Sequence, residues 1–569
     1  MTASAPVDFR SAARAWIEED PDPETVAELE ALLASGVDAE LADRFSTRLA
    51  FGTAGLRGEM GAGPNRMNRV TVRYAAAGLA RVVASQGGAA REAGVVIGFD
   101  ARRNSAAFAS DTAAVLAGAG VRAMVLPRPL PTPVLAFAVR HLSAAAGVMV
   151  TASHNPAGDN GYKVYWADGA QIVPPIDEDI AAAIDAITSL REVALAPDDD
   201  PRIERLDDSI VEAYVAMAAA TPHASLPVVG EQVIAAYTPL HGVGRDVFLR
   251  VVAATGLRQP VVVETQADPD PDFPTVAFPN PEEPGAMDAV VDLARDAGAT
   301  LAVANDPDAD RVAIAIPDGD GGEWRRLTGD EVGWLLADHL LREVGPPAGD
   351  DRPSLVATTI VSSRLLEVIA AANGARYEET LTGFKWLARP ALARPDLRSV
   401  LAYEEALGYA VGGQLDKDGI TAAVVLVALA NALAQQGETL ADRLSQLAER
   451  YGSHATGQWS LRRDGPGGLE RLRAVMVRLR RALPDEVAGH AVLEARDLLT
   501  DEGRGSLPAT DAVVLTLDGG HRVVVRPSGT EPKAKVYVEA VGATADGATR
   551  ELRGLLDAMR VLLDDEEES

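Results

Sequence analysis

GVMVTASHNPAGDNGYK, residues 147–163, joins a short apolar run to a dense polar turn. The run Gly147 to Val150 is typical of a buried strand, because it is short, partly β-branched and followed at once by turn residues. The polar residues behind it include Thr151, Ser153, His154 and Asn155. We therefore expect a strand to deliver a hydroxyl, an imidazole and an amide to the edge of a sheet, where α/β proteins bind ligands. An ordinary polar turn is the alternative, and three later loops of the same kind count against it.

Strands and helices alternate on both sides of this stretch. We expect strands at 94–100, 123–126, 233–237, 261–264, 300–304, 355–358 and 399–403. The helices expected between them include 70–86, 105–118, 209–220, 330–343, 363–372, 419–435 and 440–451. This alternation predicts βαβ units and a mostly parallel sheet. From about residue 456 the order changes to a helix at 468–483 and strands at 512–517, 521–525 and 535–540, which indicates an α+β domain with an antiparallel sheet.

A chain of 569 residues is too long for one hydrophobic core. We predict an N-terminal helical extension at 1–50 and four domains: I at 51–222, II at 223–327, III at 328–455 and IV at 456–569. In the first three, an apolar strand repeatedly ends in a polar loop with unusual residues. This pattern predicts tandem copies of one fold.

The charge and composition exclude several classes of protein. The formal net charge is −30, so the basic surface typical of nucleic-acid binding is absent. Zero cysteines exclude disulfides, thiolate metal sites and cysteine nucleophiles. No apolar run is long enough to cross a bilayer, and the first residues lack a signal pattern, so we expect a cytoplasmic protein without a membrane partner. An anionic substrate would need local arginine or lysine residues to overcome the acidic field.

The loop Asp306-Pro-Asp-Ala-Asp-Arg311 places three carboxylates at alternate positions after an apolar strand. Their oxygens can converge on one Mg²⁺ or Ca²⁺ ion when the chain wraps around it. An EF-hand loop does not fit, because Arg311 stands at the sixth position, where that loop needs glycine. The remaining alternative is a solvated acidic turn. A metal site favours a phosphate partner, which Arg311 could hold with two hydrogen bonds.

Three further loops carry groups that suit a phosphorylated ligand. Residues 526–533, RPSGTEPK, offer an arginine fork, two hydroxyls and backbone N–H groups around a glycine, although an ordinary turn is possible. Residues 403–409, YEEALGY, carry paired carboxylates that could bind sugar hydroxyls or metal, or begin a helix. Residues 381–386, LTGFKW, carry a lysine that could reach a phosphate or lie on the surface.

Taken together, TASHNP, DPDADR, EEALG and RPSGTEP resemble, in this order, the motifs of the α-D-phosphohexomutase superfamily of phosphoglucomutases and phosphomannomutases. The resemblance covers the chain from about residue 50. FGTAGLRG, NGYKVYW, NDPDADR, EETLTGFKW and LDKDG are most similar to the branch that includes phosphopentomutases of the phosphoglucomutase-2 type. The resemblance implies three tandem mixed α/β sandwich domains and a C-terminal α+β domain like the TATA-binding protein, heart-shaped around a central cleft.

The resemblance also implies a mechanism and its residues. Ser153 would carry a phosphoryl group, and one Mg²⁺ ion per chain would be held by Ser153, Asp306, Asp308 and Asp310. Lys163 matches a lysine described as a general acid or base, although a surface lysine is the alternative. Arg57 and His154 would lie around the phosphoserine. The substrate-binding residues implied are Arg311, Thr382, Gly383, Lys385, Glu404, Ala406, Arg526, Ser528, Gly529 and Thr530.

The implied activity is that of a phosphoglucomutase, which interconverts glucose 1-phosphate and glucose 6-phosphate with a sugar bisphosphate as intermediate and activator. Mannose or pentose phosphates are alternative substrates, and a sugar bisphosphate synthase, a phosphatase or an inactive binding protein is an alternative function. Ala406, Tyr409 and Ala54 differ from residues common in the family, which leaves the preferred sugar open. We expect small-molecule sugar phosphates as partners and either a monomer or a homodimer.

Overall fold

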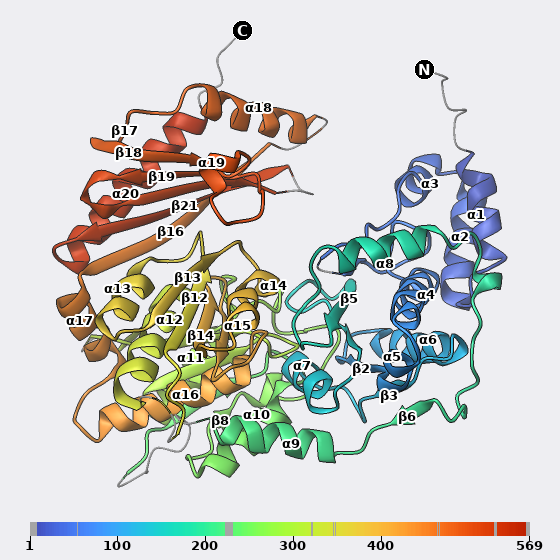
Figure 1. Cartoon of the computed structure of the whole chain (residues 1–569), viewed down its shortest axis with the longest axis horizontal. Coiled ribbons are helices and arrows are strands. Elements are labelled where there is room, and N and C mark those ends of the chain that lie inside the picture. Colours follow the sequence, from blue (N-terminus) through green and yellow to red (C-terminus); the bar gives the residue numbers. More distant parts are fainter. Residues whose placement is uncertain are drawn as a thin grey trace. The chain divides into compact units, whose positions relative to one another are not determined.

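The computed structural model describes residues 8–53, 55–221, 231–319, 322–344, 346, 349–463, 465, 467–528 and 532–564. The chain forms two compact units. Unit 1 contains residues 1–326 and 408–435, and unit 2 contains residues 327–407 and 436–569. The described residues form four β-sheets, which are labelled in Figure 1.

The first sheet of unit 1 has six strands in the order β1-β5-β4-β2-β3-β6. Its strands are β1 (Leu56–Glu59), β2 (Val95–Phe99), β3 (Ala123–Val125), β4 (Ala146–Val150), β5 (Asp159–Trp166) and β6 (Ile203–Arg205). β4, β2, β3 and β6 run parallel, whereas β5 pairs antiparallel with β4 and with β1. Every residue of β4 is buried, as expected for a central strand covered on both faces.

Helices surround this sheet. They are α4 (Arg69–Ser85), α5 (Gly88–Ala93), α6 (Ser105–Gly118), α7 (Thr132–His141), α8 (Ile176–Asp185) and α9 (Ser209–Ala219). α6 and α7 both pack against β2, and α8 packs against α4. The N-terminal helices α1 (Phe9–Ile17), α2 (Pro23–Ser35) and α3 (Asp38–Phe45) form a small core of their own around Ala13, Leu29 and Leu41. Side chains of Asp8 and Asp22 cap α1 and α2.

The second sheet of unit 1 has the order β11-β10-β9-β7-β8. Its strands are β7 (Ala235–Thr238), β8 (Val261–Val262), β9 (Leu301–Asn305), β10 (Val312–Asp318) and β11 (Glu323–Arg326). β9, β7 and β8 are parallel and β10 returns antiparallel to β9, so β10-β9-β7-β8 repeats the arrangement of β5-β4-β2-β3. The helices are α10 (Gly244–Thr255) and α11 (Asp288–Ala297), and residues 408–435 add β15 (Gly408–Val411) and α16 (Gly419–Ala434), which packs against α10, β9 and β10.

Unit 2 begins with a parallel sheet in which β12 (Ser354–Thr359) lies between β13 (Arg376–Thr380) and β14 (Arg398–Glu404). Its helices are α12 (Gly329–Asp338), which continues as a π-helical turn at His339–Val344, α13 (Leu365–Ala372), α14 (Phe384–Leu387), α15 (Arg389–Ala393) and α17 (Leu440–Tyr451). Thr328 and Glu331 form a capping box at the start of α12.

The other sheet of unit 2 is antiparallel, with the order β16-β21-β20-β19-β18-β17. The strands are β16 (Ser453–Arg462), β17 (Glu486–Val487), β18 (His490–Asp497), β19 (Val513–Leu517), β20 (Arg522–Pro527) and β21 (Lys533–Gly542). The helices are α18 (Gly468–Arg481), α19 (Asp501–Arg504) and α20 (Ala545–Asp564), and α20 packs on β16 and β21 (Figure 1). The change to an antiparallel α+β arrangement after residue 456 is therefore confirmed.

The expectation of a mostly parallel sheet needs a correction, because both sheets of unit 1 are mixed. The predictions missed the return strands β5 and β10, and read β1 as a glycine-rich loop. Residues 159–163 have the polar composition of a turn, and only their pairing with β4 makes them a strand. The segment 380–386, expected as a loop, includes the start of the short helix α14 at Phe384.

None of the described helices is both long enough and apolar enough to cross a membrane. The four domain boundaries given above stay predictions.

Candidate active site

Ser153 lies in the loop that connects β4 to β5, and its backbone is unusual. Its φ is +52°, in the left-handed region that non-glycine residues rarely adopt. The Ser153 N–H donates to Thr151 Oγ1 at 2.8 Å, and the Ser153 hydroxyl donates to Asp306 Oδ2 at 2.7 Å. The residue is 3% exposed. A hydroxyl group is thus held in a fixed place beside a carboxylate that lies 153 positions away in the sequence.

The acidic loop connects β9 to β10 in the second sheet, the position that corresponds to the Ser153 loop in the first. Asp306, Asp308 and Asp310 are each 0% exposed, and one oxygen of each lies within 4.8 Å of the others. Ala309 has φ +54°, so this loop also contains one left-handed non-glycine residue. The Arg311 N–H donates to Asp306 Oδ1 at 3.0 Å. The chain therefore wraps around its own carboxylates, as the sequence predicted.

Two loops that the sequence did not assign to the site hold this acidic loop in place. Thr132, at the start of α7, donates its N–H to Asp308 O at 3.0 Å and its hydroxyl to Asp308 Oδ2 at 2.6 Å. The Val243 N–H donates to Pro307 O at 2.8 Å. A Cβ atom on Gly242 would lie 2.3 Å from Pro307 Cα, so only glycine permits this approach. These two loops belong to the stretches PRPLPTP, residues 127–133, and PLHGVG, residues 239–244. Each stretch follows an expected strand, and this is the signal from which the sequence could have assigned it to the site.

Two lysines face the carboxylates. Lys163, on β5, places its Nζ atom 2.8 Å from both Asp308 Oδ2 and Asp310 Oδ2, and Lys417 Nζ lies 3.2 Å from Asp310 Oδ2. Burial alone would lower the pKa of Lys163, but Asp308 and Asp310 outweigh it and raise the pKa. Lys417 belongs to the LDKDG motif, and its contact with the site was not predicted.

The three carboxylates fit a hard divalent cation. Asp308 Oδ1 and Asp310 Oδ1 are buried, and neither has a hydrogen-bond partner among the described residues. Burial, followed by the charges of Asp308 and Asp310, raises the pKa of Asp306 well above its usual value. Buried carboxylate oxygens at this density are the ligands that Mg²⁺ and Ca²⁺ prefer, and they need a compensating positive charge.

A histidine and two arginines lie near Ser153. His154 Nδ1 lies 3.2 Å from Ser153 Oγ. Burial, and then the charges of Arg311 and Arg57, lower the pKa of His154, so its imidazole is neutral. Arg57 is on β1, in register with Gly161 of β5, and Arg311 Nη1 lies 3.6 Å from Glu282 Oε2. Within unit 1 the structure thus brings together Ser153, His154, Lys163, the three aspartates and two arginines.

The other predicted site residues lie in unit 2. Thr382, Gly383 and Lys385 follow β13, whereas Glu404 is the last residue of β14 and Ala406 follows it. Both groups therefore lie at the carboxyl edge of one parallel sheet. Arg526 is in β20 and Ser528 follows it, with the Ser528 N–H donating to Lys533 O at 2.8 Å. Gly529, Thr530 and Ala54 lie outside the described residues.

Four family profiles match the chain in succession. Their descriptions are phosphoglucomutase/phosphomannomutase, alpha/beta/alpha domain I at residues 48–191, domain II at 212–320 and domain III at 328–451, and the C-terminal domain of the same family at 476–551. The chain belongs to the phosphoglucomutase/phosphomannomutase family. The resemblance noted in the sequence and the four-domain α/β architecture that it implied are confirmed.

Relatives within this family are named for different sugars. A probable phosphomannomutase of Haemophilus influenzae is 42% identical over 87% of this chain and 98% of its own length. A probable phosphoribomutase of Schizosaccharomyces pombe is 37% identical over 96% of both chains. The crystal structure of the Paramecium phosphoglucomutase parafusin, in its open form, superposes with a TM-score of 0.69 at 17% identity and covers 92% of this chain and 98% of that chain, which shows the fold alone. The family is thus one of mutases that act on sugar phosphates, and the names do not agree on the sugar.

Proposed function

We propose that this member of the family is a phosphoglucomutase that interconverts glucose 1-phosphate and glucose 6-phosphate through a phosphoserine at Ser153. The observation that carries the proposal is the 2.7 Å hydrogen bond from the Ser153 hydroxyl to Asp306, the first of three buried carboxylates. A buried hydroxyl beside a divalent-cation site and two arginines suits the transfer of a phosphoryl group and has no evident structural purpose.

The proposed reaction has two transfers that balance each other. In the first, the bond between phosphorus and Ser153 Oγ breaks and a bond from phosphorus to a free sugar hydroxyl forms. The proton of that sugar hydroxyl is passed on to Ser153 Oγ, which is left as a free hydroxyl group. The sugar is then a bisphosphate. In the second, the bond between the other phosphoryl group and its sugar oxygen breaks, and that phosphoryl group is transferred to Ser153 Oγ. The proton of the Ser153 hydroxyl passes to the sugar oxygen, and the isomeric sugar monophosphate is released. Overall no phosphate and no water are consumed.

Asp306, Asp308 and Asp310 would hold one Mg²⁺ ion, together with an oxygen of Ser153. When bound, Mg²⁺ neutralises negative charge on the phosphoryl group as it is transferred. Arg57 and Arg311 supply fixed positive charge on the side of Ser153 that also carries the neutral His154. Lys163, whose Nζ atom lies 2.8 Å from Oδ2 of both Asp308 and Asp310, is the residue that we assign as the general acid and base of the two transfers.

In unit 2, Thr382, Gly383, Lys385, Glu404 and Ala406 would bind the sugar, and Arg526, Ser528, Gly529 and Thr530 would bind the phosphate that is not transferred. Arginine forks and backbone N–H groups suit a phosphate, and a carboxylate such as Glu404 suits sugar hydroxyls. Ala406 offers no hydroxyl group, which removes one polar contact to the sugar.

A pentose phosphate is the second candidate substrate, because the phosphoribomutase relative aligns with this chain over 96% of both lengths. The chemistry would be the same, with transfer between C1 and C5. The missing hydroxyl at Ala406 is consistent with a different set of sugar contacts.

The test measures isomerisation of glucose, mannose and ribose 1-phosphates with the matching bisphosphate as activator, for the wild type, Ser153→Ala and a control, Ser110→Ala. Ser110 is an exposed serine on α6. We expect glucose 1-phosphate to give the highest kcat/KM, Ser153→Ala to lose about 10³-fold or more in kcat, and the control to match the wild type. Full activity of Ser153→Ala would overturn the phosphoserine assignment, and a preference for ribose 1-phosphate would replace glucose with the second candidate.

The same assay distinguishes a mutase from two other uses of the serine. Stoichiometric release of inorganic phosphate would show a phosphatase. Accumulation of free sugar bisphosphate without isomerised monophosphate would show a bisphosphate synthase.

A further inference from the structure

Arg102 is a buried arginine that binds the Ser153 loop from behind. It lies in the turn after β2, is 5% exposed and belongs to none of the motifs discussed above. Its Nη2 atom donates to Ser153 O at 2.7 Å and to Asn155 O at 2.5 Å. Its Nη1 atom donates to Pro156 O at 2.7 Å and to Asp159 O at 3.2 Å. All four Nη hydrogens of one guanidinium group are therefore used on one loop.

The guanidinium group has two further neighbours, a carboxylate and an aromatic ring. Asp100 Oδ2 lies 3.5 Å from Arg102 Nε, and Asp100 Oδ1 accepts from the Arg102 N–H at 3.0 Å. The ring of Phe273, which comes from the proline-rich loop 268–284, stacks with its centroid 4.9 Å from Arg102 Cζ. A planar group fixed in this way has little freedom, so it can impose a shape on the loop that it binds.

The loop needs such support because of Ser153. Its φ of +52° is a strained conformation for a residue with a Cβ atom. The trans peptide that follows points its C=O and its N–H in opposite directions. Fixing the Ser153 carbonyl on Arg102 therefore also fixes the direction of the His154 N–H, and it restricts the ψ angle of Ser153, whose hydroxyl contacts Asp306.

We propose that Arg102 is a positioning residue for the phosphoryl transfer: it touches neither the sugar nor the reacting atoms, but holds Ser153 in the left-handed backbone conformation in which Oγ contacts Asp306. This inference rests on the proposed function, because it assumes that Ser153 is the phosphoryl carrier. The inference adds that phosphoryl transfer requires the forked shape of the guanidinium group at position 102, and not only its positive charge. A lysine at this position keeps the charge, but its three donor hydrogens on one nitrogen are fewer than the four carbonyls that Arg102 binds.

The test measures the rate at which Ser153 is phosphorylated by glucose 1,6-bisphosphate, by rapid quench and intact mass, in Arg102→Lys and Arg102→Met. The matched controls are Arg103→Lys and Arg103→Met, since Arg103 is the neighbouring arginine, is largely exposed and pairs with Asp272. We expect phosphorylation to slow about 100-fold in both Arg102 variants while KM for glucose 1-phosphate stays within about threefold, and both controls to match the wild type.

The double variant Asp100→Asn/Arg102→Met guards against misfolding, because it removes the buried carboxylate that Arg102→Met alone would leave without its counter-charge. Wild-type phosphorylation rates in the Arg102 variants, or full recovery in Arg102→Lys, would overturn the inference. A wild-type chain that takes up no phosphoryl group at Ser153 would instead overturn the proposed function, so the two failures are distinguishable.

Discussion

Glu405 is a half-buried carboxyl group next to Glu404, the residue that we expect to bind the sugar. It accepts a hydrogen bond from Ser362 Oγ at 3.1 Å. Burial, and then the charges of Glu404 and Asp330, raise its pKa to about 7. The folded chain therefore holds a proton at this position near neutral pH that the unfolded chain would release.

This pKa predicts a pH-dependent stability. A carboxyl group whose pKa is higher in the folded state contributes stability below its unfolded pKa, and that contribution is lost as the pH rises through about 7. The glutamine in Glu405→Gln stays neutral at both pH values. We therefore expect the free energy of unfolding of the variant, minus that of the wild type, to be larger at pH 8 than at pH 5 by an amount on the order of 2 kcal/mol.

Urea unfolding of unit 2 at both pH values measures this difference, with the exposed Glu367→Gln on α13 as the control. An equal effect of both substitutions would show that the Glu405 pKa is not raised.

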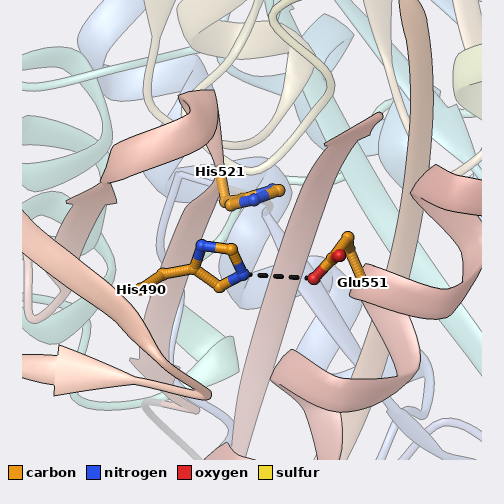
Figure 2. Close-up of side chains that lie close together, drawn as sticks. All are labelled: His490, His521 and Glu551. Atoms are coloured by element: carbon orange, nitrogen blue, oxygen red, sulfur yellow. Dashed lines mark hydrogen bonds and ion pairs between the residues drawn. The ribbon is translucent and has the colours of Figure 1, made fainter. Parts of the chain in front are cut away.

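At the scale of elements, a histidine cluster joins β18 to α20 in unit 2 (Figure 2). His490 Nε2 lies 3.1 Å from Glu551 Oε2, and His490 Nδ1 lies 3.3 Å from Asp518 Oδ1. The ring of His521 stands above, with its centroid 4.3 Å from that of His490. Two histidines and a glutamate with ligand atoms within 4.8 Å of one another could suggest a zinc site.

The hydrogen bonds argue against that interpretation. The Val541 N–H donates to His521 Nδ1 at 3.0 Å, so a neutral His521 carries its proton on Nε2 and has no lone pair left for a metal. Burial, and then the charge of His490, lower the pKa of His521, which favours this neutral form.

We predict that equimolar Zn²⁺ changes the melting temperature of the wild type and of His490→Asn equally, because any zinc that binds does so elsewhere. Differential scanning fluorimetry of both proteins checks this. A shift that only the wild type shows would establish a metal site at His490, His521 and Glu551.

The sequence predicted the strands that lead into each loop but not those that lead out. β4, β9 and β14 are apolar runs, so their composition alone reveals them. β5 pairs antiparallel with β4, and β10 pairs antiparallel with β9. β5 begins with the polar residues of a turn, so its pairing with neighbouring strands, and not its composition, makes it a strand. Lys163, on β5, could be recognised from a motif. Its position opposite Asp308 and Asp310 depends on the pairing of β5, so the sequence did not predict it.

The candidate site was predictable where a residue lies in a motif and unpredictable where it acts through another element. Ser153 and the three aspartates follow apolar strands in compact polar loops, which is a local signal. Thr132, Lys417 and Arg102 reach the site from separate segments through contacts that depend on the tertiary fold. No local pattern distinguishes such residues from ordinary loop residues.

At the scale of the whole molecule, a buried carboxylate links the antiparallel sheet of unit 2 to the start of α13. Glu539, on β21, is 3% exposed and accepts from Ser363 Oγ at 2.6 Å and from the Arg364 N–H at 2.8 Å, both at the start of α13. His454 Nδ1 lies 3.0 Å from Glu539 Oε1. Burial alone would raise the pKa of Glu539, but His454 and Arg522 outweigh it and lower the pKa to about 2.

We expect Glu539→Gln to destabilise unit 2 by about 3 kcal/mol, because the substitution leaves buried positive groups without their partner. The contribution of Glu539 is present at neutral pH and is lost as the pH falls from about 4.5 through about 2, since its folded pKa is the lower one. Urea unfolding at pH 7 measures the change, with the exposed Glu494→Gln on β18 as the control. Equal stability of the wild type and Glu539→Gln would contradict a stabilising role for the contact between β21 and the start of α13.

The central claim is that Ser153 carries the phosphoryl group. The most direct measurement is the intact mass of the protein after treatment with glucose 1,6-bisphosphate, and again after a chase with glucose 1-phosphate, with the phosphorylated residue located by fragmentation. We predict one phosphoryl group per chain, on Ser153, at a steady level during the chase while the sugar is isomerised, and none in Ser153→Ala. Isomerisation by a chain that carries no phosphoryl group, or carries it on another residue, would contradict the account.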